Sequence, residues 1–100
     1  MSTYPTKLDR ELIQAVSSLK GEKEITDFFR DLLTPAEIEE FSRRFQIAKL
    51  LWTTNLSYVE IAQKVGTSTT TVTRVGQWLY KEPWHGYSAV LQKMCGKSQR

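Results

Sequence analysis

The stretch SYVEIAQKVGTSTTTVTRVGQWL, residues 57–79, decides the fold of this chain. Ser57 stands three residues before Glu60, the spacing of a capping box, in which a hydroxyl and a carboxylate each accept a backbone N–H of the helix start. We therefore expect a helix to begin after Ser57. Gly66 follows two turns later and tolerates the positive φ at which many helices end.

A second helix is predicted after the turn at Gly66. Val72, Val75 and Leu79 recur at helical spacing and so share one face. The other face carries polar and basic side chains, namely Thr70, Thr73, Arg74 and Gln77. Six of the seven residues from 67 to 73 are Thr or Ser, which disfavour helix, so we expect a weakly stable helix. The two helices have the pattern of a helix-turn-helix at residues 57–80.

Apolar residues at helical spacing predict four further helices, over residues 6–19, 22–33, 35–52 and 87–94. The third has the clearest start, Thr34-Pro35 with Glu37 in capping position, and it is apolar on more than one side. Residues 96–100 read as a loose basic tail. No convincing strand is found, so the expected fold class is all-α, with about six helices in a single domain of residues 1–100.

Composition excludes several kinds of function. There is no apolar run of about 18 residues and no secretory signal pattern, so we expect a soluble cytoplasmic protein with no membrane contact. One cysteine, Cys95, and one histidine, His85, supply neither a disulfide nor a zinc set. His85 has no partner at triad spacing and reads as a turn residue. We expect no metal, no cofactor and no enzymatic activity.

Charge is unevenly distributed along the chain. Residues 1–40 hold five basic and nine acidic side chains, a balance of −4, whereas residues 41–100 hold nine basic and two acidic, a balance of +7. The positive part contains the predicted helix-turn-helix, which suits a surface that meets phosphates. A chain of 100 residues also has a modest core, so a second copy would help to bury the apolar helices, and we expect a homodimer.

The run from Leu32 to Leu79 resembles the Trp repressor family, and the whole chain is similar to its YerC/YecD-like branch. The resemblance rests on the Leu-Thr-Pro-x-Glu helix start, on Arg44, on Gly66 and on the Thr73-Arg74 pair. It implies an intertwined homodimer whose two helix-turn-helix units enter successive major grooves of double-stranded DNA at a roughly palindromic operator. Half-sites of such dimers, the Trp repressor among them, lie about 34 Å apart.

The resemblance also points to an effector pocket. In the founding member tryptophan binds between the reading head and the dimer core, and residue-by-residue matching brings Leu33, Thr34, Arg44 and Arg74 of this chain to that pocket. A glycine and a serine that line it are matched here by Val75 and Trp78. We hypothesise that these larger side chains fill a vestigial pocket, so that tryptophan is not required. The alternatives are that Trp78 is an ordinary core or flanking aromatic, or that the protein is a tryptophan-dependent repressor.

For DNA contact the sequence favours the start and outer face of the second helix, at Ser68, Thr69, Thr70 and Thr73, with Tyr58 and Lys64 reaching phosphates. Hydroxyls bond phosphates or base edges, and Thr methyls contact thymine methyls, but neither discriminates as strongly as Arg on guanine. Instead of holding the carboxylate of an effector, Arg44 and Arg74 could pair with acidic residues or contact phosphate.

The expected function is a sequence-specific transcriptional regulator, a repressor by steric exclusion. The alternatives to DNA contact are a merely solvated Thr/Ser face and a helical dimer used for protein–protein contact.

Overall fold

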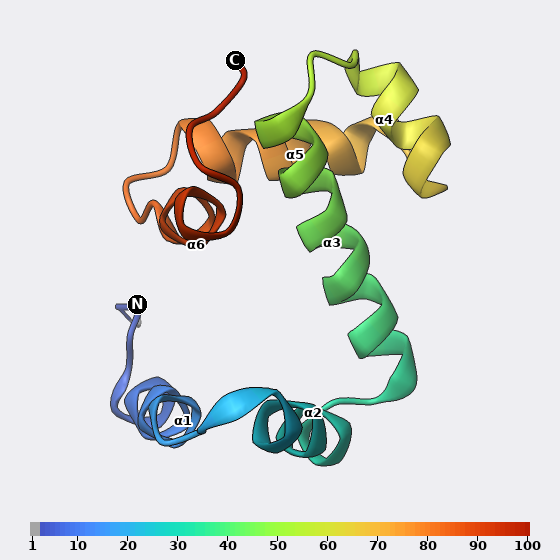
Figure 1. Cartoon of the computed structure of the whole chain (residues 1–100). Coiled ribbons are helices and arrows are strands. Elements are labelled where there is room, and N and C mark those ends of the chain that lie inside the picture. The colour runs from blue at the N-terminus through green and yellow to red at the C-terminus, as the bar shows by residue number, and fades with distance from the viewer. Residues whose placement is uncertain (1–2) are drawn as a thin grey trace. The chain divides into compact units, whose positions relative to one another are not determined.

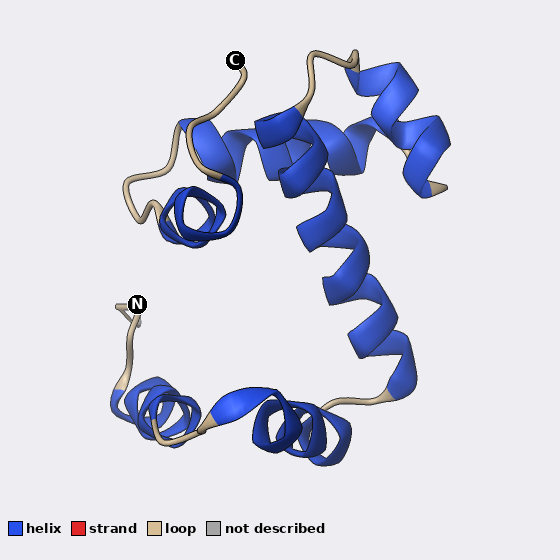
Figure 2. Ribbon diagram, viewed as in Figure 1, coloured by secondary structure: helices blue, strands red, loops and turns tan. Residues whose placement is uncertain are grey.

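The computed structural model describes residues 3–100, in which the chain forms six α-helices and no strand (Figures 1 and 2). The helices are α1 (Lys7–Ser17), α2 (Gly21–Leu32), α3 (Pro35–Thr53), α4 (Tyr58–Val65), α5 (Thr69–Tyr80) and α6 (Gly86–Cys95). This confirms the all-α fold class, and every predicted helix is present close to its expected bounds. His85 takes a φ of 57° immediately before α6, as a turn residue does.

Two compact units divide the chain, the first ending at Ile38 and the second beginning at Glu39. In the first unit, α1 and α2 are amphipathic helices with no buried residue. Their apolar side chains remain exposed, up to 78% for Leu8 and 46% for Leu32. Within the first unit these apolar faces are therefore not covered.

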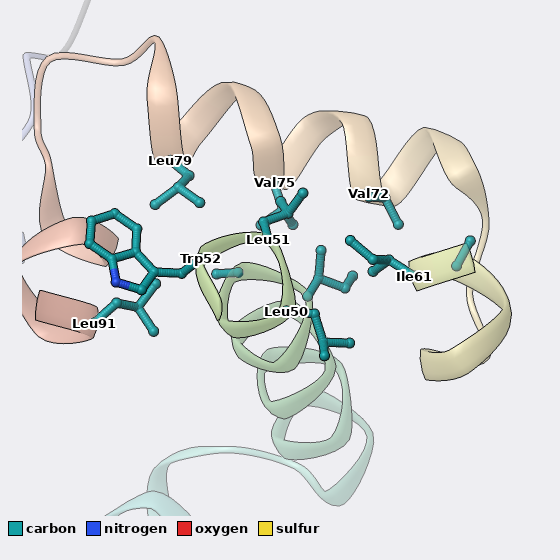
Figure 3. Packing of buried hydrophobic residues seen from close by; sticks show 11 residues of the cluster. Leu50, Leu51, Trp52, Ile61, Val72, Val75, Leu79 and Leu91 are labelled. Atoms are coloured by element: carbon teal, nitrogen blue, oxygen red, sulfur yellow. The ribbon is translucent and has the colours of Figure 1, made fainter. Parts of the chain in front are cut away.

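The hydrophobic core lies in the second unit, where α3, α4, α5 and α6 meet. Figure 3 shows Val72, Val75 and Leu79 on the side of α5 that faces Leu51 and Ile61 of α3 and α4. The indole of Trp52 lies with Leu91 of α6 at the other end of the same cluster. The apolar stripe predicted for the second motif helix is confirmed, because its three members are at most 2% exposed.

Local signals fix the ends of α4 and α5. The Ser57 hydroxyl accepts the N–H of Glu60 at 3.1 Å, and the Glu60 carboxylate accepts the N–H of Ser57 at 3.0 Å, which completes the predicted capping box. Gly66 ends α4 with a φ of 80°, as expected for a left-handed cap. Ser68 then caps α5 by accepting the N–H of Thr71. These caps determine where both helices of the motif begin and where α4 ends.

Only part of the burial predicted for α3 is found. Its buried residues all lie in the C-terminal half, at Ile47, Ala48, Leu50, Leu51 and Trp52. In the first half Phe41 is 44% exposed, because no helix of the second unit covers that end. The apolar residues of α3 are thus buried at its end beside the motif and, within the second unit, not at its beginning.

The prediction of a loose tail at residues 96–100 is wrong. The Gln99 N–H donates to the Trp52 carbonyl at 2.8 Å, and the Arg100 Nε donates to the Leu51 carbonyl at 2.8 Å. Gly96, Lys97, Gln99 and Arg100 are exposed, as the charges of the segment suggest, but the free carbonyls at the end of α3 give its donors partners, so the segment is not loose.

Among the described residues, no helix combines the length and the apolar character needed to cross a membrane.

The composition of α5 predicts uneven stability within the second unit. We expect the amide protons of residues 69–73 to exchange about tenfold faster than those of residues 41–51, because Thr is a poor helix former. Hydrogen exchange followed by NMR at neutral pH measures both segments in one sample. Equal protection in the two segments would contradict the expectation.

Candidate nucleic-acid interface

The solvent-facing side of α5 carries the polar residues predicted to meet a partner. Val72 and Val75 point into the core (Figure 3). Thr73 and Arg74, which lie between them in sequence, are exposed. Exposed residues at the start and on the outer side of the helix are Ser68, Thr69, Thr70, Thr73, Arg74 and Gln77. The structure thus brings the four predicted DNA-contact residues of this helix to one accessible region, where no buried contact holds them.

The hydroxyl groups of this surface are not equivalent. Ser68 is committed to capping, since its oxygen accepts the Thr71 N–H and lies 3.0 Å from the Thr71 hydroxyl. The Thr73 hydroxyl donates to the Thr69 carbonyl at 2.9 Å, so it can offer a partner only its lone pairs and its methyl group. The hydroxyls of Thr69 and Thr70 form no hydrogen bond with another described residue, so both stay able to donate and to accept.

Tyr58 and Lys64, predicted to reach phosphates, occupy different environments on α4. Lys64 is exposed in the last turn and has no ion pair within the described part of the chain. Tyr58 is half-buried, and its hydroxyl lies against Gly76 of α5, where an added Cβ would come within 2.6 Å of it. The ring of Tyr58 therefore contributes to the packing between α4 and α5, and Gly76 makes room for it.

The carboxylate of Glu60 is part of the start of α4. The backbone N–H and the hydroxyl of Ser57 hold the pKa of Glu60 below its usual range. A carboxyl with a lowered pKa contributes its stabilisation above the unfolded pKa and loses it as the pH falls through the folded one. The capping box is consequently intact at neutral pH.

Arg44 of α3 lies between two aromatic rings. Its guanidinium carbon is 5.4 Å from the centre of the Phe41 ring and 5.5 Å from that of Trp78, within the range of cation–π attraction. Its Nε is 3.3 Å from a carboxylate oxygen of Glu40. Burial against the hydrophobic core raises the pKa of Tyr87, and the charge of Arg44 acts in the opposite direction.

The predicted pocket residues are distributed over both units. Arg44 and Trp78 face each other, Val75 is fully buried in the core, and Arg74 is exposed with no ion pair among the described residues. Leu33 and Thr34 belong to the first unit, where the Thr34 hydroxyl accepts the Glu37 N–H at the start of α3. The vestigial pocket therefore remains a prediction.

Sequence reasoning missed several residues of this region. Phe41 stands three residues before Arg44, a spacing that predicts contact on a helix, and this signal was available. Gly76 interrupts the middle of α5, where a glycine is costly unless another group approaches closely. No local signal marks Tyr87 or Arg100, because their partners lie far away in sequence.

These features define the class of protein: an all-α helix-turn-helix protein whose second motif helix exposes hydroxyl and basic groups. The sequence matches the Trp repressor protein family over residues 7–95, and the chain belongs to the Trp repressor family. The Trp repressor family is a regulatory DNA-binding family.

The chain is similar to one uncharacterised relative in sequence and to two solved structures. The chain is 36% identical over 69 residues to the uncharacterized protein YerC of Bacillus subtilis (strain 168), a match that covers 69% of this chain and 65% of that protein. A candidate Trp repressor from Staphylococcus aureus has a similar crystal structure, with a TM-score of 0.82 and 32% identity, covering 93% of this chain and 91% of the other. A TrpR-like protein from Eubacterium eligens ATCC 27750 has a TM-score of 0.79 and 38% identity, covering 90% and 91%.

The contact between Tyr58 and Gly76 can be tested with a mutant cycle. We expect Gly76→Ala to lower the free energy of unfolding by about 1 kcal/mol, since the added methyl overlaps the Tyr58 hydroxyl. In a Tyr58→Phe background the hydroxyl is absent, so the added methyl meets only ring carbons, the nearest at 3.3 Å, and the gain in helix propensity makes the change close to neutral or stabilising. Denaturant unfolding of the four proteins gives the coupling.

Gly86→Ala is the matched control, because a Cβ at Gly86 meets no atom within 4 Å. A cost of Gly76→Ala that is the same with and without the Tyr58 hydroxyl would contradict the contact.

Proposed function

We propose that this protein is a sequence-specific DNA-binding transcriptional regulator, which acts as a homodimer, represses by occupying its operator and does not require tryptophan. The observation that carries the proposal is the capped helix pair α4–α5, which buries Val72 and Val75 and leaves Thr69, Thr70 and Thr73 exposed. A helix whose apolar side is packed against the core can enter a major groove with its polar side facing the bases.

The first unit supports the dimer. With no buried residue, α1 and α2 leave apolar side chains between 39% and 45% exposed, namely Leu12, Val16, Ile25 and Phe29. Exposed apolar faces of this extent are uncommon on monomeric proteins and indicate an interface. Intertwining with a second copy, as the family resemblance implies, would cover these faces.

The exposed side chains suit a combination of phosphate and base contact. Lys64 and Arg74 have charges that no carboxylate neutralises within the described residues, and such cations bind phosphate oxygens. Thr70 can donate to or accept from a base edge, whereas Thr73 offers its methyl and lone pairs. With no arginine among these reading residues, we expect moderate discrimination between operator sequences.

The two aromatic rings beside Arg44, those of Phe41 and Trp78, support a DNA-binding regulator that works without a corepressor. The indole of Trp78 already lies over the Arg44 guanidinium, and a second ring, that of Phe41, lies near the same cation. A free tryptophan would have to compete with a side chain that is held in place by the helix itself. We therefore infer that the built-in indole replaces the ligand and that Arg44 serves to hold it.

A selection of bound fragments from random DNA tests this function. We expect the wild-type protein to enrich a roughly palindromic sequence without tryptophan, with affinity that falls steeply as salt rises. Thr70→Ala combined with Thr73→Ala should reduce the preference for that sequence by about 1 kcal/mol or more, the lower range for lost base contacts.

Thr26→Ala is a matched control, because its hydroxyl also donates to the carbonyl four residues before it, on α2. Unchanged sequence preference in the double variant would contradict the assigned reading residues. If the wild-type protein shows no salt-dependent DNA binding at all, the alternative of a helical dimer for protein contact is favoured.

The absence of a tryptophan requirement is tested by titration calorimetry. We expect no heat of binding when tryptophan is added to the wild-type protein at micromolar concentration, since Trp78 occupies the space beside Arg44. Trp78→Ser should open that space and permit weak binding. Micromolar affinity in the wild type would instead identify a tryptophan-dependent repressor.

A further inference from the structure

Residues 96–100 make long-range hydrogen bonds that the proposed function leaves unexplained. The Trp52 indole Nε1 donates to the Gly96 carbonyl at 2.7 Å, and the Gln99 N–H donates to the Trp52 carbonyl at 2.8 Å. The Arg100 guanidinium donates from Nε to the Leu51 carbonyl at 2.8 Å and from Nη2 to the Leu56 carbonyl. One short segment thus binds the end of α3 at several points.

These bonds satisfy carbonyl groups that a helix leaves without partners. The last carbonyls of an α-helix have no intrahelical N–H to accept. At the end of α3, the Leu51 carbonyl accepts from Arg100 and, at 3.2 Å, from the Tyr80 hydroxyl, while the Trp52 carbonyl accepts from Gln99. The last turn of α3 has no basic residue of its own, so Arg100 also supplies the positive charge that a helix C-terminus favours.

The chain turns at Gly96, the residue that follows α6. Its φ of 76° and ψ of −153° lie in a region that is essentially restricted to glycine. A Cβ at this position would meet no atom within 4 Å, so the backbone conformation, and not lack of space, requires glycine. The turn at Gly96 leads the chain from the end of α6 back to α3.

We propose that residues 96–100 form a clasp, and that Arg100 is a positioning residue for the helix-turn-helix. Leu56, whose carbonyl accepts from Arg100, directly precedes Ser57, the N-cap of α4. Arg100 therefore joins the last turn of α3 to the residue before α4 and fixes the direction in which α4 leaves α3. The effect on DNA binding rests on the proposed function, whereas the clasp itself does not.

Hydrogen exchange tests the clasp directly. We expect Arg100→Gln and Arg100→Lys each to speed the exchange of the Gln99 amide and the Trp52 indole N–H by about tenfold, because neither side chain has the rigid, planar fork of N–H groups with which the guanidinium meets the Leu51 and Leu56 carbonyls. Gly96→Ala should also speed the exchange of these two protons, because alanine disfavours the backbone conformation of Gly96.

Lys97→Gln is the matched control, since Lys97 is exposed and forms no hydrogen bond or ion pair with another described residue. An unprotected Gln99 amide in the wild type, or one unaffected by Arg100→Gln, would overturn the clasp.

DNA binding tests the positioning role with the same variants. We expect both Arg100 variants to bind operator DNA about tenfold more weakly, with the salt dependence of the wild type, since the charge of lysine does not restore the two hydrogen bonds. A direct phosphate contact would instead lower the salt slope by about 1 in Arg100→Gln and be rescued in Arg100→Lys, and that result would overturn positioning. If the wild type binds no DNA, the proposed function fails, while the exchange measurements still decide the clasp.

Discussion

Burial of one apolar stripe of α5 against the end of α3 is the interaction on which the second unit depends. Val72, Val75 and Leu79 are almost fully buried, and full burial of such side chains contributes about 1.5–3 kcal/mol each. The Thr-rich start of α5 contributes little helical stability of its own, so tertiary packing must hold the helix. Since the stripe faces inward, the hydroxyl side of the same helix must face solvent. Stability and the proposed reading surface therefore arise from one periodic pattern.

Local patterns in the sequence were enough to predict the helices and the motif. The Ser57–Glu60 box, the Gly66 turn and the spacing of the apolar residues are all short-range signals, and the structure confirms each of them. Contacts between distant residues could not be predicted in this way. The proximity of Arg44 to Trp78, and of Arg100 to Leu51, depends on how α3 meets α5 and on the turn after α6. For the same reason the hydrogen bonds of residues 96–100 to α3 could not be predicted, and the segment was wrongly expected to be loose.

The two units differ in how far they bury their apolar side chains. In the second unit four helices share one core, and cation, aromatic and carbonyl partners are found for Arg44 and Arg100 within the chain. In the first unit α1 and α2 bury no residue, although their amphipathic pattern is just as regular. A pattern in sequence specifies which face must be covered but not which chain covers it. That is why the same reasoning succeeded for α5 and left α1 and α2 without a partner.

Under the proposed function, the indole of Trp78 beside Arg44 has a consequence for gene control. A reader gated by a small molecule reports the level of that molecule, because ligand binding shifts its active population. A reader that carries its own indole has no such input, and occupancy of its operator follows the amount of protein in the cell. If two chains must pair before binding, the active species rises with the square of the chain concentration while dimers are scarce. Synthesis and turnover of the protein would then set the threshold of the response.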